Sequence, residues 1–205
     1  MIDAAAFTVP VRGDIVGVME REWDRLSRPG TTLTAYERTA LAAAARTPVQ
    51  TAGGEPKLEA ATRIAHDAHS IDRAFVDGLC DRGVTAAEYV EIIGLVSRLA
   101  AIDTFHRLLG APPPPLPLPT PGDPSNDLNP MAQPGRAFVP MVRGASIIYA
   151  LTLIPDEHEA MMDDVHDTFY LSTTQMQQPT SPRAITRPQI ELLGTLTSVE
   201  NECFY

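Results

Sequence analysis

The sequence predicts an all-α fold, and three observations support this prediction. Aromatic residues make up only 6% of the 205 residues, while Ala and Leu dominate outside a Pro-rich centre, which favours helices over a sandwich or a barrel. Apolar residues recur at spacings of three and four, the period of one helical face. Three segments begin with the spacing of a capping box, at Thr34, Thr85 and Thr186. The hydrophobic content of 44% is enough for a substantial core.

The first 110 residues are predicted to form five helices. Their expected ranges are 14–28, 34–45, 57–69, 70–80 and 85–109. Trp23 in the first of them is expected to be a packing residue. The fifth has the widest apolar face, so we expect it to be largely buried and to end at Gly110.

Residues 111–124 contain eight prolines, which exclude helix interior and sheet because proline lacks an N–H and has a fixed φ. An extended strap of roughly 40 Å is expected there, at about 3.1 Å per residue. Helical patterns resume at 146–153 and 156–170, and 171–182 is expected to be a loop. The last helix is expected to start at Thr186 and to place Ile190, Leu193, Leu196 and Val199 on one face.

These elements suggest a division into three parts: a helical unit at 1–110, a Pro-rich linker at 111–145 and a second helical unit at 146–205. A weak internal match supports two related units, since Leu33-Thr34 aligns with Ile185-Thr186. On that offset Glu191 corresponds to Thr39. Any chemistry is therefore expected in the second unit.

Charge and motifs exclude several function classes. The net charge of −10 and pI near 4.9 argue against nucleic acid and anionic membranes as partners. No phosphate-binding loop or nucleophile elbow is present. The N-terminus lacks the pattern of a signal peptide, and two cysteines are too few for a disulfide framework, so a cytoplasmic location is expected.

The histidines and Cys80 give weaker signals. His66 and His69, or His158 and His166 with an acidic neighbour, could in principle bind a metal, but neither set has a third ligand at fixed spacing. No metal or cofactor is therefore expected. Cys80 is expected to be a buried packing residue.

The C-terminal segment combines Glu191 with Asn-Glu-Cys-Phe-Tyr at 201–205. It resembles the alkylhydroperoxidase D-like and carboxymuconolactone decarboxylase family, most closely its peroxidase-related members. In that pattern a second cysteine and a histidine follow, and here they would fall after Tyr205. The segment 88–105 is similar to the family's closing helix. The resemblance implies an all-helical fold, self-association into oligomers, and a small-molecule peroxide and a thiol reductant as partners.

The resemblance implies that Cys203 and Glu191 are the catalytic residues. One thiol attacks peroxide, a second resolves the sulfenic acid, and a glutamate relays protons. Cys203 corresponds to the resolving thiol and Glu191 to a buried relay, so the 205-residue chain is not expected to turn over peroxide. Two alternatives stay open: a non-catalytic oligomerising helical protein, in which the apolar face of the last helix needs cover, and a carboxymuconolactone decarboxylase-like enzyme.

Overall fold

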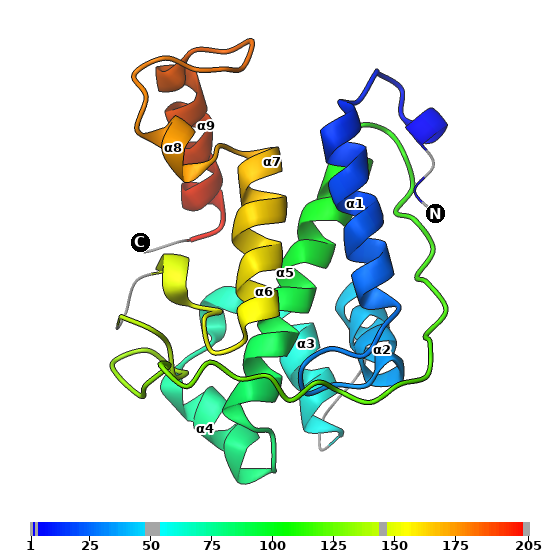
Figure 1. Cartoon of the computed structure of the whole chain (residues 1–205), viewed down its shortest axis with the longest axis vertical. Coiled ribbons are helices and arrows are strands. Elements are labelled where there is room, and N and C mark those ends of the chain that lie inside the picture. The colour runs from blue at the N-terminus through cyan, green and yellow to red at the C-terminus, as the bar shows by residue number, and fades with distance from the viewer. Residues whose placement is uncertain (1, 3, 48–53, 144–146, 203–205) are drawn as a thin grey trace.

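A computed structural model describes residues 2, 4–47, 54–143 and 147–202 of the chain (Figure 1). The predicted all-α class is confirmed, because these residues contain helices and no β-strand. An isolated antiparallel bridge joins Gln133 and Met141. No helix in these ranges has both the length and the apolar character needed to cross a membrane.

In the described part of the first 110 residues the five expected helices form. They are α1 (Gly13–Leu26), α2 (Ala35–Arg46), α3 (Pro56–His66), α4 (Arg73–Asp81) and α5 (Ala86–Leu108), with short 3-10 helices at Ala4–Ala6 and Ala68–Ser70. Capping boxes are present at the starts of α2 and α5, where the side chains of Thr34 and Thr85 accept hydrogen bonds from the Glu37 and Glu88 backbone amides. The predicted helix starts at these two positions are therefore confirmed.

Helix α5 is the centre of the bundle, with α1, α2, α3 and α6 packed against it (Figure 1). Its 23 residues span about 35 Å at 1.5 Å per residue. Most of its side chains are buried, as its wide apolar face predicts, and Gly110 follows it with φ of 73°. Trp23 of α1 is buried in the same core, which confirms its predicted packing role.

The Pro-rich segment 111–124 is extended and contains neither helix nor strand, as predicted. It runs beside α1 and α2 (Figure 1). Proline carbonyls hold it in place: Pro115 accepts from Trp23 Nε1 at 2.8 Å and Pro114 from Arg46 Nη1 at 2.8 Å. Near its far end the Thr120 amide donates to the Ser27 carbonyl at 2.7 Å. Because prolines lack N–H groups, most backbone groups of this strap, residues 111–124, can only accept hydrogen bonds.

The second half of the chain differs in part from its prediction. The expected helix at 156–170 is present as one continuous rod made of α6 (Pro155–Glu159), a π-helical segment (Ala160–His166) and α7 (Asp167–Phe169). Within the predicted loop at 171–182 there is one short helix, α8 (Thr173–Met176). The last helix, α9 (Arg187–Glu200), is present as expected, with its capping box at Thr186.

The expected helix at 146–153 is wrong for the residues that are described, 147–153. Only a 3-10 turn, Ile147–Tyr149, forms there. The Thr152 hydroxyl donates to the Tyr149 carbonyl at 2.6 Å and accepts from the Val142 amide at 2.9 Å. These bonds replace an α-helical ladder, and Pro155 starts a new helix immediately afterwards.

The two predicted units share a core. Leu151, Leu153 and Ile154 belong to the same hydrophobic cluster as the side chains of α1, α2, α3 and α5. By contrast, α9 buries only Ile190 among its described residues. The unit boundaries therefore stay a prediction, while the core of residues 2–154 is continuous across the linker.

Candidate functional sites

A network of buried charged side chains lies where α1, α2, α5 and α6 meet. Glu91 of α5 is completely buried, and Arg38 of α2 is buried beside it and ion-paired to it. One Glu91 oxygen also accepts from the Thr32 amide at 2.7 Å and the Leu33 amide at 3.2 Å. A methyl group at Gly30 would overlap both Glu91 and Arg38, so the network requires glycine at this position.

The second half of the buried network is centred on Arg98 of α5. Its guanidinium lies 2.6 Å from Glu22 of α1 and 2.7 Å from Glu157 of α6. Glu157 is also 3.3 Å from Arg38, which links the two halves, and Arg25 lies 3.3 Å from Glu22. Three carboxylates thus face three guanidiniums, so the network is electrically balanced, as buried charges require.

The electrostatics favour the charged forms of Glu157 and Arg98. Burial raises the pKa of Glu157, but the Arg98 and Arg38 guanidiniums outweigh it, so this pKa lies below its ordinary value of 4.5. Burial lowers the pKa of Arg98 less than Glu157 and Glu22 raise it. Groups held in one charge state at neutral pH are poor proton carriers, so Arg98 and Glu157 serve to join α5 and α6 rather than to move protons.

The lowered pKa of Glu157 predicts a loss of stability in acid. A carboxyl whose pKa is lower in the folded than in the unfolded chain stabilises the fold above its ordinary pKa, and this contribution is lost as the pH falls below 4.5. We expect Glu157→Gln to reduce the free energy of unfolding by about 3 kcal/mol at neutral pH and by clearly less at about pH 3.5. Urea unfolding of both proteins at the two pH values measures this, and an equal difference at both would contradict it.

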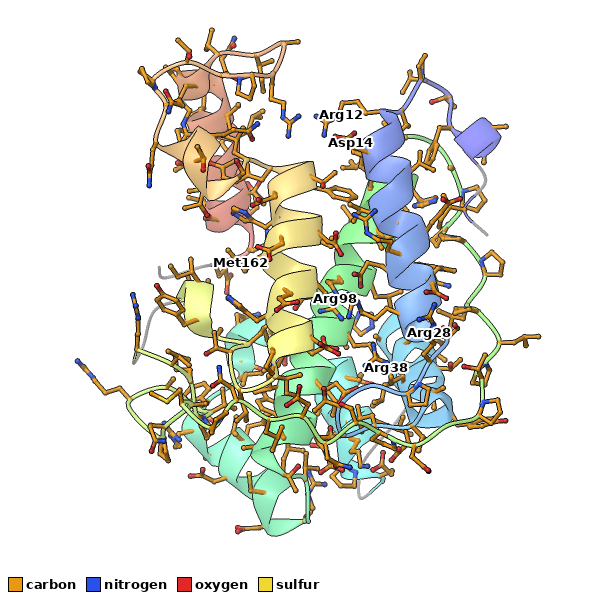
Figure 2. The ribbon with its side chains drawn as sticks, in the orientation of Figure 1. Arg12, Asp14, Arg28, Arg38, Arg98 and Met162 are labelled. Atoms are coloured by element: carbon orange, nitrogen blue, oxygen red, sulfur yellow. The ribbon has the colours of Figure 1, made fainter. Side chains whose placement is uncertain are left out.

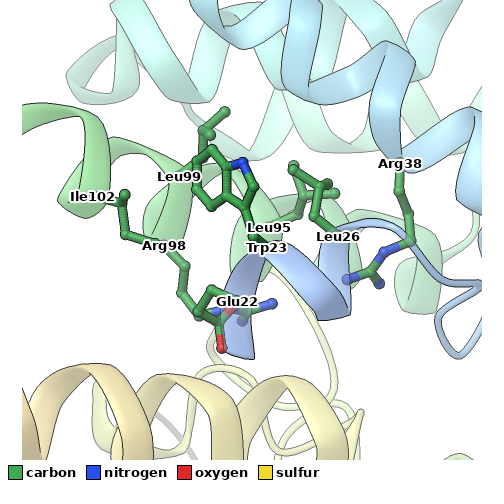
Figure 3. Close-up of a pocket in the computed structure, with 8 residues that line it drawn as sticks. All are labelled: Glu22, Trp23, Leu26, Arg38, Leu95, Arg98, Leu99 and Ile102. Carbon is green, nitrogen blue, oxygen red and sulfur yellow. The ribbon is translucent and has the colours of Figure 1, made fainter. Parts of the chain in front are cut away.

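A small cavity adjoins the buried network (Figure 3). Its volume is about 20 Å³, and its walls include Glu22, Arg38, Arg98 and Trp23. The Nε atom of Arg38 is buried without a hydrogen-bond partner in the described part of the chain. A cavity of about 10–15 Å³ already holds one water molecule, so this one fits a single water and no organic substrate.

Sequence reasoning missed this network. Its members come from four helices and are separated by up to 135 positions, from Glu22 to Glu157. One local signal was available: Glu91 and Arg98 are seven residues apart in the mostly apolar middle of α5, which places both on one face of the helix. Charged residues at core positions are almost always paired. The seven-residue spacing of Glu91 and Arg98 therefore indicates an ionic cluster.

Glu191, one of the two predicted catalytic residues, does not have the expected burial. Its side chain is 52% exposed and is paired with Arg187 of the preceding turn at 2.6 Å. The Tyr170 hydroxyl donates to it at 3.1 Å. Glu200 ends α9 nine residues later, about 14 Å along the axis. The predicted burial was wrong, because Ile190 is the only described α9 residue that is buried and the adjacent Glu191 points away from it.

Cys203, the other predicted catalytic residue, lies outside the described residues. Glu202, which precedes it in sequence, has a φ of 53° and lies 3.9 Å from His69 Nε2. His69 is also 3.4 Å from Asp67. A hollow of about 480 Å³ opens here, lined by His66 at the end of α3, His69 of the 3-10 helix Ala68–Ser70, and residues 200–202 at and after the end of α9. Two histidines and the C-terminal end of α9 therefore meet at one hollow.

Other predicted candidates can be placed directly. Cys80 is exposed rather than buried, because α4 turns Val76 and Leu79 to the core and leaves Cys80 on its outer face. His106 is buried in α5, and its Nδ1 lies 2.8 Å from the Ile102 carbonyl. Within the described ranges no group of three His, Cys, Asp or Glu side chains could hold a metal ion.

Comparison of the chain with family models, curated proteins and solved structures gave no match.

Proposed function

We propose that the chain takes part in thiol-dependent peroxide reduction, with Cys203 as its redox thiol and His69 as the base that takes the proton of this thiol. One observation carries the proposal: the residue before Cys203 contacts His69 at the edge of a hollow large enough for a small peroxide. The resemblance of 185–205 to the alkylhydroperoxidase D-like family supports thiol chemistry at Cys203, but the family pattern gives Cys203 the resolving role, whereas this proposal gives it the attacking role. His69 is favoured over Glu191, because Glu191 is paired with Arg187 and lies about 14 Å from the end of α9.

The proposed step needs one thiol and one peroxide. The imidazole of His69 takes the proton of the Cys203 thiol, the sulfur attacks one peroxide oxygen, and the O–O bond breaks. Sulfur is oxidised to a sulfenic acid, and the other oxygen leaves with a proton as water or an alcohol. Two molecules of an added thiol reduce the sulfenic acid, giving their disulfide and water.

The chain contains an internal control for this chemistry, because Cys80 is an exposed thiol at a different place in the fold. Exposed to hydrogen peroxide and a sulfenic-acid-trapping 1,3-dione, Cys203 is expected to be labelled at least about tenfold faster than Cys80. His69→Ala is expected to remove most of that advantage and Glu191→Gln little of it. Mass spectrometry of the labelled peptides gives both rates. Equal labelling of the two cysteines would reject the proposal.

A second candidate function is a non-catalytic helical protein that assembles through α9. Leu192, Leu196 and Val199 are each more than half exposed, and their spacing of four and three is that of a coiled-coil seam. Such a seam can pair with the same helix of a second copy. Sedimentation of the same preparations separates the candidates, since assembly without selective Cys203 oxidation would favour this one.

A further inference from the structure

The strongest unassigned feature is a groove between the start of α1, α7 and α9. Its volume is about 640 Å³, within the range of small-molecule sites. The walls are mostly apolar and include Phe169, Ile185, Ile190 and Leu193. Leu193 is 55% exposed, and Ile185 is 40% exposed. A groove of this size with exposed aliphatic walls suits an apolar chain.

Two arginines converge on the same groove. Arg12 Nη2 donates to the Thr168 carbonyl at 2.8 Å, and Arg183 Nη2 donates to the same carbonyl at 3.3 Å and to the Tyr170 carbonyl at 3.0 Å. The two guanidiniums therefore lie side by side at the end of α7. Figure 2 shows Arg12 and Asp14 at the end of α1 that faces this region.

These two arginines share one paired carboxylate, so one positive charge is left over. Asp14 accepts two hydrogen bonds from Arg12, each of 3.0 Å. Arg183 has no carboxylate within ion-pair distance in the part of the chain that is described. Burial and the charge of Arg12 lower the pKa of Arg183. Since Glu191 is already paired with Arg187, the rim carries an excess positive charge.

We propose that this groove binds a small amphipathic carboxylate, with the carboxylate on Arg183 and Arg12 and an unbranched apolar chain along Ile190 and Leu193. Arginine binds carboxylates through paired N–H donors, and Arg183 has donors left after its two backbone bonds. The apolar chain covers aliphatic surface that otherwise faces water. The proposal is independent of any role of Cys203.

Decanoate is a suitable probe, and decyltrimethylammonium has the same chain length with the opposite charge. In calorimetric titrations below the micelle concentration, decanoate is expected to bind at least about tenfold more tightly. Arg183→Gln is expected to weaken decanoate binding about tenfold, while Arg183→Lys recovers part of the loss. Arg136→Gln, a change of an exposed arginine outside the groove, is the matched control and is expected to have no effect.

Asp14→Asn tests the proposal in the opposite direction, because partial unfolding would weaken binding and the proposal predicts that binding becomes tighter. It releases Arg12 from its carboxylate, so decanoate is expected to bind several-fold more tightly. Thermal unfolding of each variant checks that the fold is kept. Equal affinity for the two amphiphiles, or decanoate binding that is unchanged in both Arg183→Gln and Asp14→Asn, would overturn the proposal.

Discussion

Arg98→Met is expected to reduce the free energy of unfolding by about 3–5 kcal/mol, the cost of removing one partner from a buried ion pair. Methionine fills similar space but leaves Glu22 with Arg25 alone and Glu157 with Arg38 at 3.3 Å. Both carboxylates are 5% exposed or less, so water cannot replace the lost guanidinium. Urea unfolding followed by circular dichroism measures the change.

The matched control for Arg98→Met is Arg28→Met. Arg28 pairs with Asp24 on the surface of α1, and both side chains are more than half exposed. Its replacement is expected to change stability by at most about 0.5 kcal/mol. Adding Glu157→Leu to Arg98→Met is expected to restore part of the stability, because the unpaired carboxylate is removed. Equal unfolding midpoints for Arg98→Met and Arg28→Met would show that the buried network does not hold the helices together.

Gly94→Ala and Gly78→Ala are expected to change stability in opposite directions, although both glycines lie inside helices. A methyl group at Gly94 of α5 would overlap Glu157 and press on Arg98, and it would therefore separate the Arg98–Glu157 ion pair. The free energy of unfolding is expected to fall by about 3 kcal/mol. At Gly78 of α4 nothing lies within 4 Å of the added carbon. There the higher helix propensity of alanine is expected to stabilise the protein by about 0.5–1 kcal/mol.

The glycine pair can be measured in the same urea titrations. Both variants make the same chemical change. If the free energy of unfolding falls in one variant and rises in the other, the surroundings of the two glycines are the cause. A stabilising Gly94→Ala would mean that α5 and α6 can separate without cost, and the tight approach of Glu157 to the α5 backbone would then have no role in the fold.

Local signals in the sequence predicted most of the helices. The capping spacings at Thr34, Thr85 and Thr186 each mark a helix start in the structure, because the cap depends only on residues three apart. The expected helix at 146–153 failed for a similar local reason. There the Thr152 side chain and the nearby Pro155 favour turns, while the apolar run alone suggested a helix.

The sites were harder to predict, since they depend on how helices meet. Glu91 and Arg98 reveal their place in the core by spacing, but their partners Arg38 and Glu157 are supplied by other helices. Burial of Glu191 was expected from a family pattern, and the residue is instead exposed because α9 lies at the edge of the bundle. Arg183 lies in a loop, where no periodicity shows which surface its side chain reaches.

The composition of the strap at 111–124 affects the chain before it folds. Each proline already has a fixed φ in the unfolded state, so bringing this segment into its extended path along α1 and α2 removes fewer conformations than a flexible linker would lose. The connection between α5 and the second half of the chain therefore costs less entropy than its length suggests. A Gly/Ser segment of equal length would keep the same topology but lower the probability that α6 finds its place against α5.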